Sequence, residues 1–208
     1  MESDNYKFII VKANTLDFDV RKQMSEIFSE GFSQWLRFFA KDKNKIAKAF
    51  AHMFVLEHFY VAITNKKVAA IATCTDGSVL SIKLNKKELR KHLGWFKGTM
   101  AHLFLKKEFE ALAENPSPSK GFIDFVGTAL EFRGKGAASK LIRYIMENTA
   151  FKEYVIGEVA DTNIPAMKLY TKLGFKEYKR KAMSRTIAKK NGINYLVSLK
   201  YVKSDMEW

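Results

Sequence analysis

The sequence predicts an α/β fold: a twisted, mostly antiparallel mixed sheet with helices on both faces. Helical and β-branched segments alternate along the chain, and from Gly121 onward the order becomes strand, helix, strand, helix. Hydrophobic residues make up 47% of the 208 residues, which supplies a sizeable core. Because no repeat, low-complexity tract or long linker interrupts this pattern, we expect a single domain over residues 1–208.

In the first half of the chain, the spacing of apolar residues predicts which segments are helices and which are strands. Runs of β-branched and aromatic residues indicate strands, whereas apolar residues that recur every three or four positions indicate helices. The expected elements are a strand over 6–12, helices over 20–39 and 42–54, a meander of strands over 59–64, 68–75 and 78–84, and a helix over 86–114 that Gly94 and Gly98 interrupt.

The second half follows the loop that contains Pro116 and Pro118. Its expected elements are a strand over 121–128, a helix over 134–148, a strand over 154–160, a short helix over 165–173, and strands over 175–183 and 193–202 that form a hairpin around Asn191 and Gly192. Two strands joined through a helix of this size should lie parallel, with a right-handed crossover.

Composition narrows the possible settings and ligands. The first residues are acidic and polar, no apolar run approaches the ~20 residues that span a bilayer, and Cys74 alone forms no internal disulfide. We therefore expect a cytoplasmic protein that does not bind membranes. The net charge of +14 suits an anionic ligand, either a nucleic acid or a cofactor with several phosphates. No metal is expected, because no histidine has a metal-ligand spacing with a cysteine.

The turn from Arg133 to Ser139 joins a predicted strand to a predicted helix. Glycines at this place let backbone N–H groups converge, and the first turn of the helix adds unpaired donors and the positive end of its dipole. Such a turn binds a phosphate or pyrophosphate. The P-loop pattern fails because Gly136 stands where a Ser or Thr is required, and the dinucleotide fingerprint fails at Ser139.

Two motifs in this region resemble those of the GNAT superfamily of acyl-CoA-dependent N-acetyltransferases. The first is Arg133-Gly-Lys-Gly-Ala-Ala138, which follows a strand as in that family. The second combines Asn163-Ile-Pro-Ala166, Leu169-Tyr170 and Leu173-Gly-Phe175. Order, spacing and secondary-structure context agree over residues 121–180.

The resemblance implies a splayed central cleft that holds acetyl-CoA. In the family's arrangement residues 121–183 form the cofactor-binding core, 1–114 the acceptor side and 184–208 a closing strand. The cofactor-binding residues that it implies are Val126, Gly127 and Thr128 for the pantetheine arm, Arg133, Gly134, Lys135, Gly136, Ala137, Ala138 and Ser139 for the pyrophosphate, and Asn163 beyond it.

Acetyl transfer to an amine needs a base, stabilisation of the oxyanion and an acid for the leaving thiolate. The resemblance makes Tyr170 the acid and Glu158 the base, with Asp124, an acidic residue inside an apolar strand, as the alternative base. The implied reaction is direct attack by a primary amine in a ternary complex. The acceptor stays open between a small amine and a protein N-terminus or lysine, and the protein between monomer and homodimer. A non-catalytic, basic nucleic-acid-binding or regulatory module is the alternative function.

Overall fold

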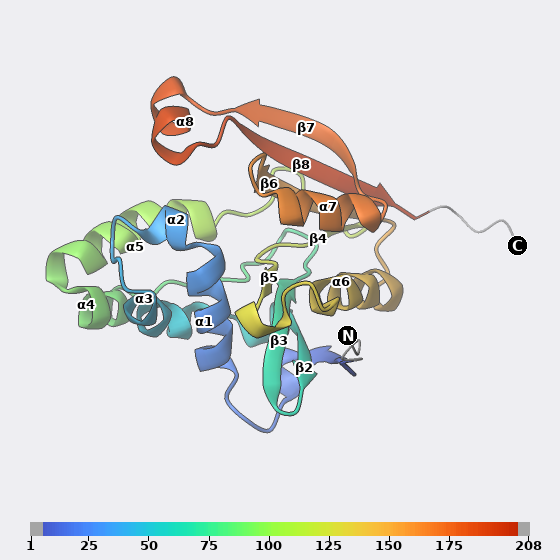
Figure 1. The fold of residues 1–208 in the computed structure, drawn as a ribbon, viewed down its shortest axis with the longest axis horizontal. Coiled ribbons are helices and arrows are strands. Elements are labelled where there is room, and N and C mark those ends of the chain that lie inside the picture. The colour runs from blue at the N-terminus through green and yellow to red at the C-terminus, as the bar shows by residue number, and fades with distance from the viewer. Residues whose placement is uncertain (1–5, 204–208) are drawn as a thin grey trace, which may run out of the picture.

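The fold was analysed in a computed structural model that describes residues 6–203. The strands are β1 Ile9–Lys12, β2 Phe59–Thr64, β3 Lys67–Thr73, β4 Lys120–Phe122, β5 Gly127–Thr128, β6 Glu153–Ala160, β7 Lys176–Ala182 and β8 Tyr195–Val202. The helices are α1 Arg21–Gly31, α2 Ser33–Leu36, α3 Lys43–Phe50, α4 Lys86–Leu93, α5 Trp95–Phe109, α6 Ala137–Asn148, α7 Ile164–Lys172 and α8 Arg185–Asn191. Figure 1 shows their arrangement.

The strands form two separate four-stranded sheets. The first has the order β1-β2-β3-β5 and is antiparallel throughout. The second has the order β4-β6-β8-β7, and only its β4–β6 pair is parallel. The connection from β4 to β6 runs through α6, so the predicted parallel pairing across this helix is confirmed, as is the α/β class.

The strand predicted over 121–128 is divided between the two sheets. Its first part, β4, pairs with β6, and its second part, β5, pairs with β3. Between them the backbone of Phe125 takes a left-handed conformation with φ 52°, which departs from the extended conformation of a regular strand. Prediction of one strand was therefore wrong here, and the division lets the two sheets part from each other.

The expected third strand of the meander, over 78–84, is also absent. The Asp76 carboxylate accepts hydrogen bonds from the backbone N–H of Ser78 (2.9 Å) and from its hydroxyl (2.7 Å), which bends the chain away from β3. The segment instead runs beside residues 53–55, where Val55 N–H donates to the Ser81 carbonyl at 3.0 Å. Only an isolated bridge forms there.

Two long helices predicted for the first half are each broken. The helix expected over 20–39 stops at Phe32, so that α1 and the short α2 replace it. Gly94, at φ 86°, separates α4 from α5 in the helix expected over 86–114. Gly98 then lets α5 approach α4 closely, since a Cβ at that position would lie 2.5 Å from the Arg90 Cα.

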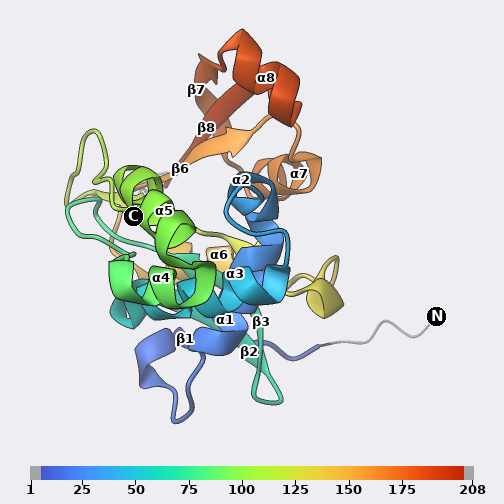
Figure 2. The same cartoon turned by 90° about the vertical axis from the view of Figure 1, so that its left-hand side faces the viewer.

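The final hairpin does not close through a tight turn at Asn191 and Gly192. Helix α8 stands between β7 and β8, and in both views α8 and the ends of β7 and β8 next to it project from the rest of the molecule (Figures 1 and 2). The pairing of the two strands themselves is confirmed.

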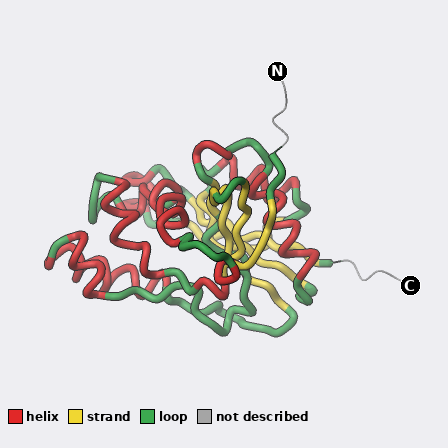
Figure 3. Tube along the Cα trace, turned by 90° about the horizontal axis from the view of Figure 1, so that it is seen from below, coloured by secondary structure: helices red, strands yellow, loops and turns green. Residues whose placement is uncertain are grey.

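Hydrophobic residues form two clusters, and Figure 3 shows the strands lying between helices. Residues of α6 and α7 contribute to one cluster, and residues of α1, α3, α4 and α5 to the other, so helices on both faces are confirmed. Cys74 is buried, and burial raises the pKa of its thiol to about 12, in keeping with a core residue. Within residues 6–203 no helix is long and apolar enough to cross a membrane.

Candidate active site

The predicted phosphate-binding turn leaves a group of backbone N–H donors without partners. Helix α6 makes its first backbone hydrogen bond from Lys140 N–H to the Gly136 carbonyl, at 2.9 Å. No side chain caps this end of the helix, so in the described chain the N–H groups of residues 136–139 make no hydrogen bond. Unpaired N–H groups at the positive end of a helix dipole are suited to hold a phosphate, as the sequence predicts for this turn.

Glycines give this turn its shape and leave space in front of it. Gly134 and Gly136 have φ values of 74° and 84°, in the left-handed region that favours glycine. A Cβ on either residue would meet no atom of the described chain within 4 Å. Packing within the protein therefore does not explain why these two residues are glycines. The open space lets an external ligand reach the backbone.

The other residues predicted for this turn are arranged less uniformly. Arg133 is exposed, Ala137 and Ala138 are buried in the first turn of α6, and Ser139 is half-buried. The Lys135 ammonium donates to the Tyr6 hydroxyl at 2.8 Å and lies 4.4 Å from the centre of its ring. The Lys135 side chain is thus held against the N-terminal segment.

The residues that divide β4 from β5 carry further free donors. In the part of the chain that the structure describes, the backbone N–H groups of Phe125 and Val126 make no hydrogen bond. Thr73 fixes the start of the segment: its N–H donates to the Asp124 carbonyl at 2.9 Å, and its hydroxyl accepts from the Asp124 N–H at 3.2 Å. The Phe125 ring anchors the other side, 5.8 Å from the ring of Phe109.

The predicted pantetheine contacts, Val126, Gly127 and Thr128, follow directly and are half-buried. Gly127 has a packing reason to be glycine, since a Cβ there would lie 2.6 Å from Cγ2 of Ile27 in α1. Glycine therefore lets α1 press close to the strand end. Thr73 and Phe125 were missed by the sequence reasoning, because nothing in the pattern of residues showed that the strand is divided.

Tyr170, the candidate acid, is buried at the end of α7 with its hydroxyl left available. The residue is 5% exposed, and its ring lies 6.2 Å from that of Phe175. Its hydroxyl makes no hydrogen bond in the described chain. The unbonded side-chain atoms that are fully buried do not include this oxygen, so the oxygen reaches the surface. Burial, and then the charge of Asp124, raise the pKa of Tyr170 well above 10, which keeps the hydroxyl protonated.

Asp124 lies near enough to Tyr170 for its charge to act on it. Dense surroundings raise the pKa of the Asp124 carboxyl from 3.8 to about 6. The residue nevertheless stays exposed to solvent. A side chain that is surrounded by protein atoms but open to water on one side accounts for both observations. Water at that opening reduces the size of the pKa shift that burial causes, and the shift stays upward.

Glu158, the candidate base, lies in a different environment. A bulge in β6 gives Glu158 a φ of 52°, so the regular alternation expected for this strand fails, and both Gly157 and Glu158 are exposed. The carboxylate of Glu158 lies 3.5 Å from the Lys181 ammonium in an exposed pair. Its N–H donates to the Ser198 hydroxyl at 3.3 Å.

Asn163 has a structural role in addition to the one predicted for it. Its side-chain oxygen accepts from the Ala166 N–H at 3.3 Å and so caps the start of α7. Its side-chain NH₂ group remains exposed at this helix end. Within residues 6–203 no group of three or more His, Cys, Asp or Glu side chains could hold a metal ion.

Comparison with known proteins agrees with this geometry. The family model described as the acetyltransferase (GNAT) family matches residues 21–175, well over half of the chain. No curated protein sequence matches the chain.

Solved structures of similar fold include several acetyltransferases. An N-acetyltransferase from Staphylococcus aureus Mu50 is 17% identical with a TM-score of 0.61, and the alignment covers 93% of this chain and 100% of that one. A candidate acetyltransferase from Salmonella typhimurium, yncA, solved with its cofactor acetyl-CoA, is 13% identical with a TM-score of 0.53, over 97% of this chain and 96% of that one. The NatC complex bound to Gag peptide and CoA is also 13% identical, with a TM-score of 0.52, over 95% and 99%.

The match of the family model and the free donors at the start of α6 lead to one conclusion: the chain belongs to the GNAT family and is an acetyl-CoA-dependent acetyltransferase.

Proposed function

We propose that this protein transfers the acetyl group of acetyl-CoA to a primary amine by direct attack in a ternary complex. The observation that carries this proposal is a buried, protonated Tyr170, whose unbonded hydroxyl reaches the surface and whose pKa is raised in part by the charge of Asp124. Asp124 directly precedes Phe125 and Val126, whose N–H groups are free, in the segment where the chain passes from one sheet to the other. An acid, a base and hydrogen-bond donors thus occur together.

Acetyl-CoA supplies an activated thioester, and the residues of this chain would bind it and move protons. The N–H groups of residues 136–139 would hold the pyrophosphate, with Gly134 and Gly136 giving access, while residues 126–128 would bind the pantetheine arm. Asn163, at the start of α7, could donate from its free NH₂ group. Arg133 and Lys135 add positive charge near the turn.

The acceptor amine must lose protons before and during attack. An aliphatic ammonium with a pKa of ~10.4 is largely charged at neutral pH, so a base is needed. The pKa of Asp124, raised by burial to about 6, leaves it ionised at pH 7 and a better proton acceptor than an ordinary carboxylate, so it could take such a proton directly or through water. Glu158 is the other candidate base, and its exposed pairing with Lys181 makes Asp124 the stronger one.

The remaining steps involve the carbonyl oxygen and the sulfur. The C–N bond forms as the C–S bond breaks, and negative charge that develops on the oxygen can be stabilised by the N–H groups of Phe125 and Val126. Tyr170 donates its proton to the leaving sulfur. Of the two protons that the ammonium loses, one restores the Tyr170 hydroxyl and the other is released to solvent.

The acceptor belongs to the class of small amines, or of protein N-termini and lysines. The basic surface of the chain, with a net charge of +14, disfavours an acceptor that carries several positive charges. Family membership also favours the enzyme over the non-catalytic nucleic-acid-binding alternative, since phosphate-backbone binding gives no reason for a buried Tyr170 with a free hydroxyl.

The test is a calorimetric titration of the purified protein with acetyl-CoA, with ATP and NAD as controls, followed by measurement of thiol release across a panel of amines. We expect selective binding of acetyl-CoA and amine-dependent release of one thiol per acetylated product. Binding without thiol release for any small amine or peptide would contradict the proposed reaction, and salt-dependent RNA or DNA binding in its place would support the alternative.

A further inference from the structure

Helix α5 turns large apolar side chains toward solvent. Its buried positions are Gly98, Ala101 and Leu105, two of which are among the smallest residues. By contrast, Phe96 and Leu103 are 65% and 62% exposed. These two residues are about two helical turns apart, so they lie on one line along the side of α5 that faces away from the core. A helix on the surface of a protein in water normally has the reverse arrangement.

Two further aromatic residues of α5 flank this line and are as exposed as its members. Trp95 lies on one flank, where the centre of its ring is 5.0 Å from Cζ of Arg90 in α4. The Arg90 Nε also donates to the Thr99 hydroxyl at 2.9 Å, so the guanidinium that contacts the ring is itself fixed. Phe104 lies on the other flank. We call the surface made by Trp95, Phe96, Leu103 and Phe104 the outer face of α5.

Basic residues surround the outer face. Residues 86–109, which span α4 and α5, contain seven Lys or Arg and two Glu. Lys97 precedes Phe104 by seven residues and Lys107 follows it by three, so both lie beside it on the helix. Within residues 6–203 the ammonium groups of Lys97 and Lys107 make no hydrogen bond or ion pair, whereas that of Lys106 lies 3.7 Å from the Glu110 carboxylate. The outer face is thus apolar in its middle and positively charged at its edge.

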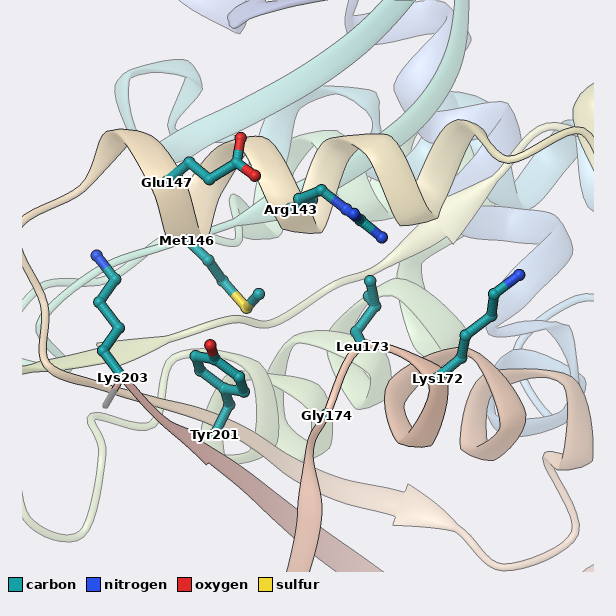
Figure 4. A pocket seen from close by; sticks show the side chains of 8 residues that line it. All are labelled: Arg143, Met146, Glu147, Lys172, Leu173, Gly174, Tyr201 and Lys203. Carbon is teal, nitrogen blue, oxygen red and sulfur yellow. The ribbon is translucent and has the colours of Figure 1, made fainter. Parts of the chain in front are cut away.

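The groove between α6, the end of α7 and the end of β8 is built differently. Met146 and Leu173 lie in its middle and are buried, and charged side chains extend around them (Figure 4). On α5 the large apolar residues are themselves exposed. Helices α4 and α5 form the left-hand edge of the molecule in Figure 1 and lie in front in Figure 2, with α6 behind them. A broad partner can therefore reach the outer face without approaching the predicted phosphate-binding turn.

Charge decides which partner suits the outer face. A second copy of this chain would bring the same lysines against the first set, and like charges placed together repel. The surface of an anionic membrane has the opposite charge. Trp, Phe and Leu side chains insert at the boundary between its headgroups and acyl chains, and Lys side chains reach its phosphates while their stems stay in apolar surroundings.

We propose that the outer face of α5 binds the surface of an anionic membrane, with Phe96, Leu103 and Phe104 inserted and Lys97 and Lys107 contacting lipid phosphates. No helix has to span the bilayer for such binding. The proposal departs from the expectation, drawn from the sequence, that the protein does not bind membranes. That expectation considered apolar runs long enough to cross a bilayer, and a helix that lies on a membrane needs none. The proposal does not depend on the proposed function.

The test is co-sedimentation of the purified protein with vesicles of phosphatidylcholine alone and of phosphatidylcholine mixed with phosphatidylglycerol. We expect binding to the mixed vesicles to be at least about 10-fold tighter, with a preference that shrinks at high salt. Phe96→Ser/Leu103→Ser should weaken this binding by about 10-fold or more, because two side chains no longer enter the apolar boundary. Lys97→Gln/Lys107→Gln should weaken it by about 10- to 30-fold.

Matched controls replace exposed residues of the same kinds outside α4 and α5. Ile9→Ser/Val202→Ser removes two apolar side chains, and Lys45→Gln/Lys48→Gln removes two charges from α3. Both controls should bind mixed vesicles as the wild type does. All four variants should keep the circular dichroism spectrum of the wild type, which reports an intact fold.

Three results would overturn the proposal. The first is a wild type that does not bind the mixed vesicles. The second is a Lys45→Gln/Lys48→Gln control that loses as much affinity as Lys97→Gln/Lys107→Gln, which would show attraction by net charge alone. The third is a dimer in sedimentation velocity that forms in place of vesicle binding and that Phe96→Ser/Leu103→Ser dissociates, which would assign the outer face to a second copy.

Discussion

Replacing Tyr170 with phenylalanine isolates one proton donor with little other change. The Tyr170→Phe substitution removes only a hydroxyl, and that hydroxyl makes no hydrogen bond in the described chain. The ring keeps its position against Phe175. We therefore expect the free energy of unfolding to change by less than ~1 kcal/mol and the dissociation constant of acetyl-CoA to stay nearly constant.

The effect on turnover should be much larger. A positioned general acid contributes about 10- to 100-fold or more, so kcat should fall by a factor equivalent to about 1.4–2.7 kcal/mol of activation free energy. Because burial and the charge of Asp124 hold the pKa of Tyr170 above its usual 10, the hydroxyl is protonated at every pH below that, and the deficit should persist from pH 6 to pH 9. Thiol release under saturating acetyl-CoA measures it.

Tyr154→Phe is a matched control for this experiment. The Tyr154 hydroxyl is fully buried and shares a hydrogen bond of 2.7 Å with the Thr149 hydroxyl, so its loss should destabilise the fold by about 1–2 kcal/mol and leave kcat unchanged. Unchanged turnover in Tyr170→Phe, with normal cofactor binding, would refute the assignment of Tyr170 and point to water as the acid.

Three further predictions test other parts of the site and fold. Asp124→Asn should lower kcat/KM by about 100-fold at pH 7 and abolish the rise in activity that ionisation of Asp124 near pH 6 produces. Glu158→Gln should change kcat/KM less than threefold. The opposite ranking of the two variants would make Glu158 the base. Gly136→Val should abolish acetyl-CoA binding in calorimetry, because a β-branched residue is strained at φ 84° and its side chain enters the space in front of the turn; retained binding in a folded variant would exclude this turn as the phosphate site. In denaturant titrations, Gly98→Ala should lower the free energy of unfolding by about 1–3 kcal/mol, because the added Cβ would clash with the backbone of α4. The control is Gly31→Ala in helix α1, where the added Cβ would meet no atom within 4 Å. This control should raise the free energy of unfolding by up to about 1 kcal/mol.

Regular elements were predictable from the sequence where one periodicity governs them. The apolar positions of α6, with Leu141, Ile142 and Ile145 on one face, recur at helical spacing and are all buried. The glycine turn before α6 was predictable because Gly134 and Gly136 directly precede the helical pattern, and both adopt a positive φ there; its binding of a phosphate stays a prediction. Asn163 and Tyr170 were predicted from the resemblance to the GNAT motifs; their roles stay predictions, to which the structure adds the cap and the unbonded hydroxyl.

Other features depend on contacts between distant residues, and no local pattern reports them. Asp76 forms its bend with Ser78, yet the next segment pairs with residues 53–55, which a meander does not foresee. Helix α8 replaces a tight turn although Asn191 and Gly192 favour one. Glu158 could not be placed because the bulge in β6 lies beside Ser198, which is distant in the sequence.

The most consequential failure, the division of the strand over 121–128, concerns the segment that we propose binds the cofactor and carries the base. In a continuous edge strand, alternate N–H groups of this segment would pair with the neighbouring strand, so two adjacent residues would not both keep free N–H groups. Phe125 reverses its backbone to φ 52° and sends its ring into the cluster of Phe28, Phe32, Phe59 and Phe109, while Thr73 holds Asp124 on the other side. The packing of that ring offsets the cost of a left-handed conformation, about 1–3 kcal/mol, and the free N–H groups of Phe125 and Val126 are its result. The irregularity that defeated the strand prediction is therefore the feature that leaves donors free next to Asp124, the base that we propose, as expected where local rules yield to function.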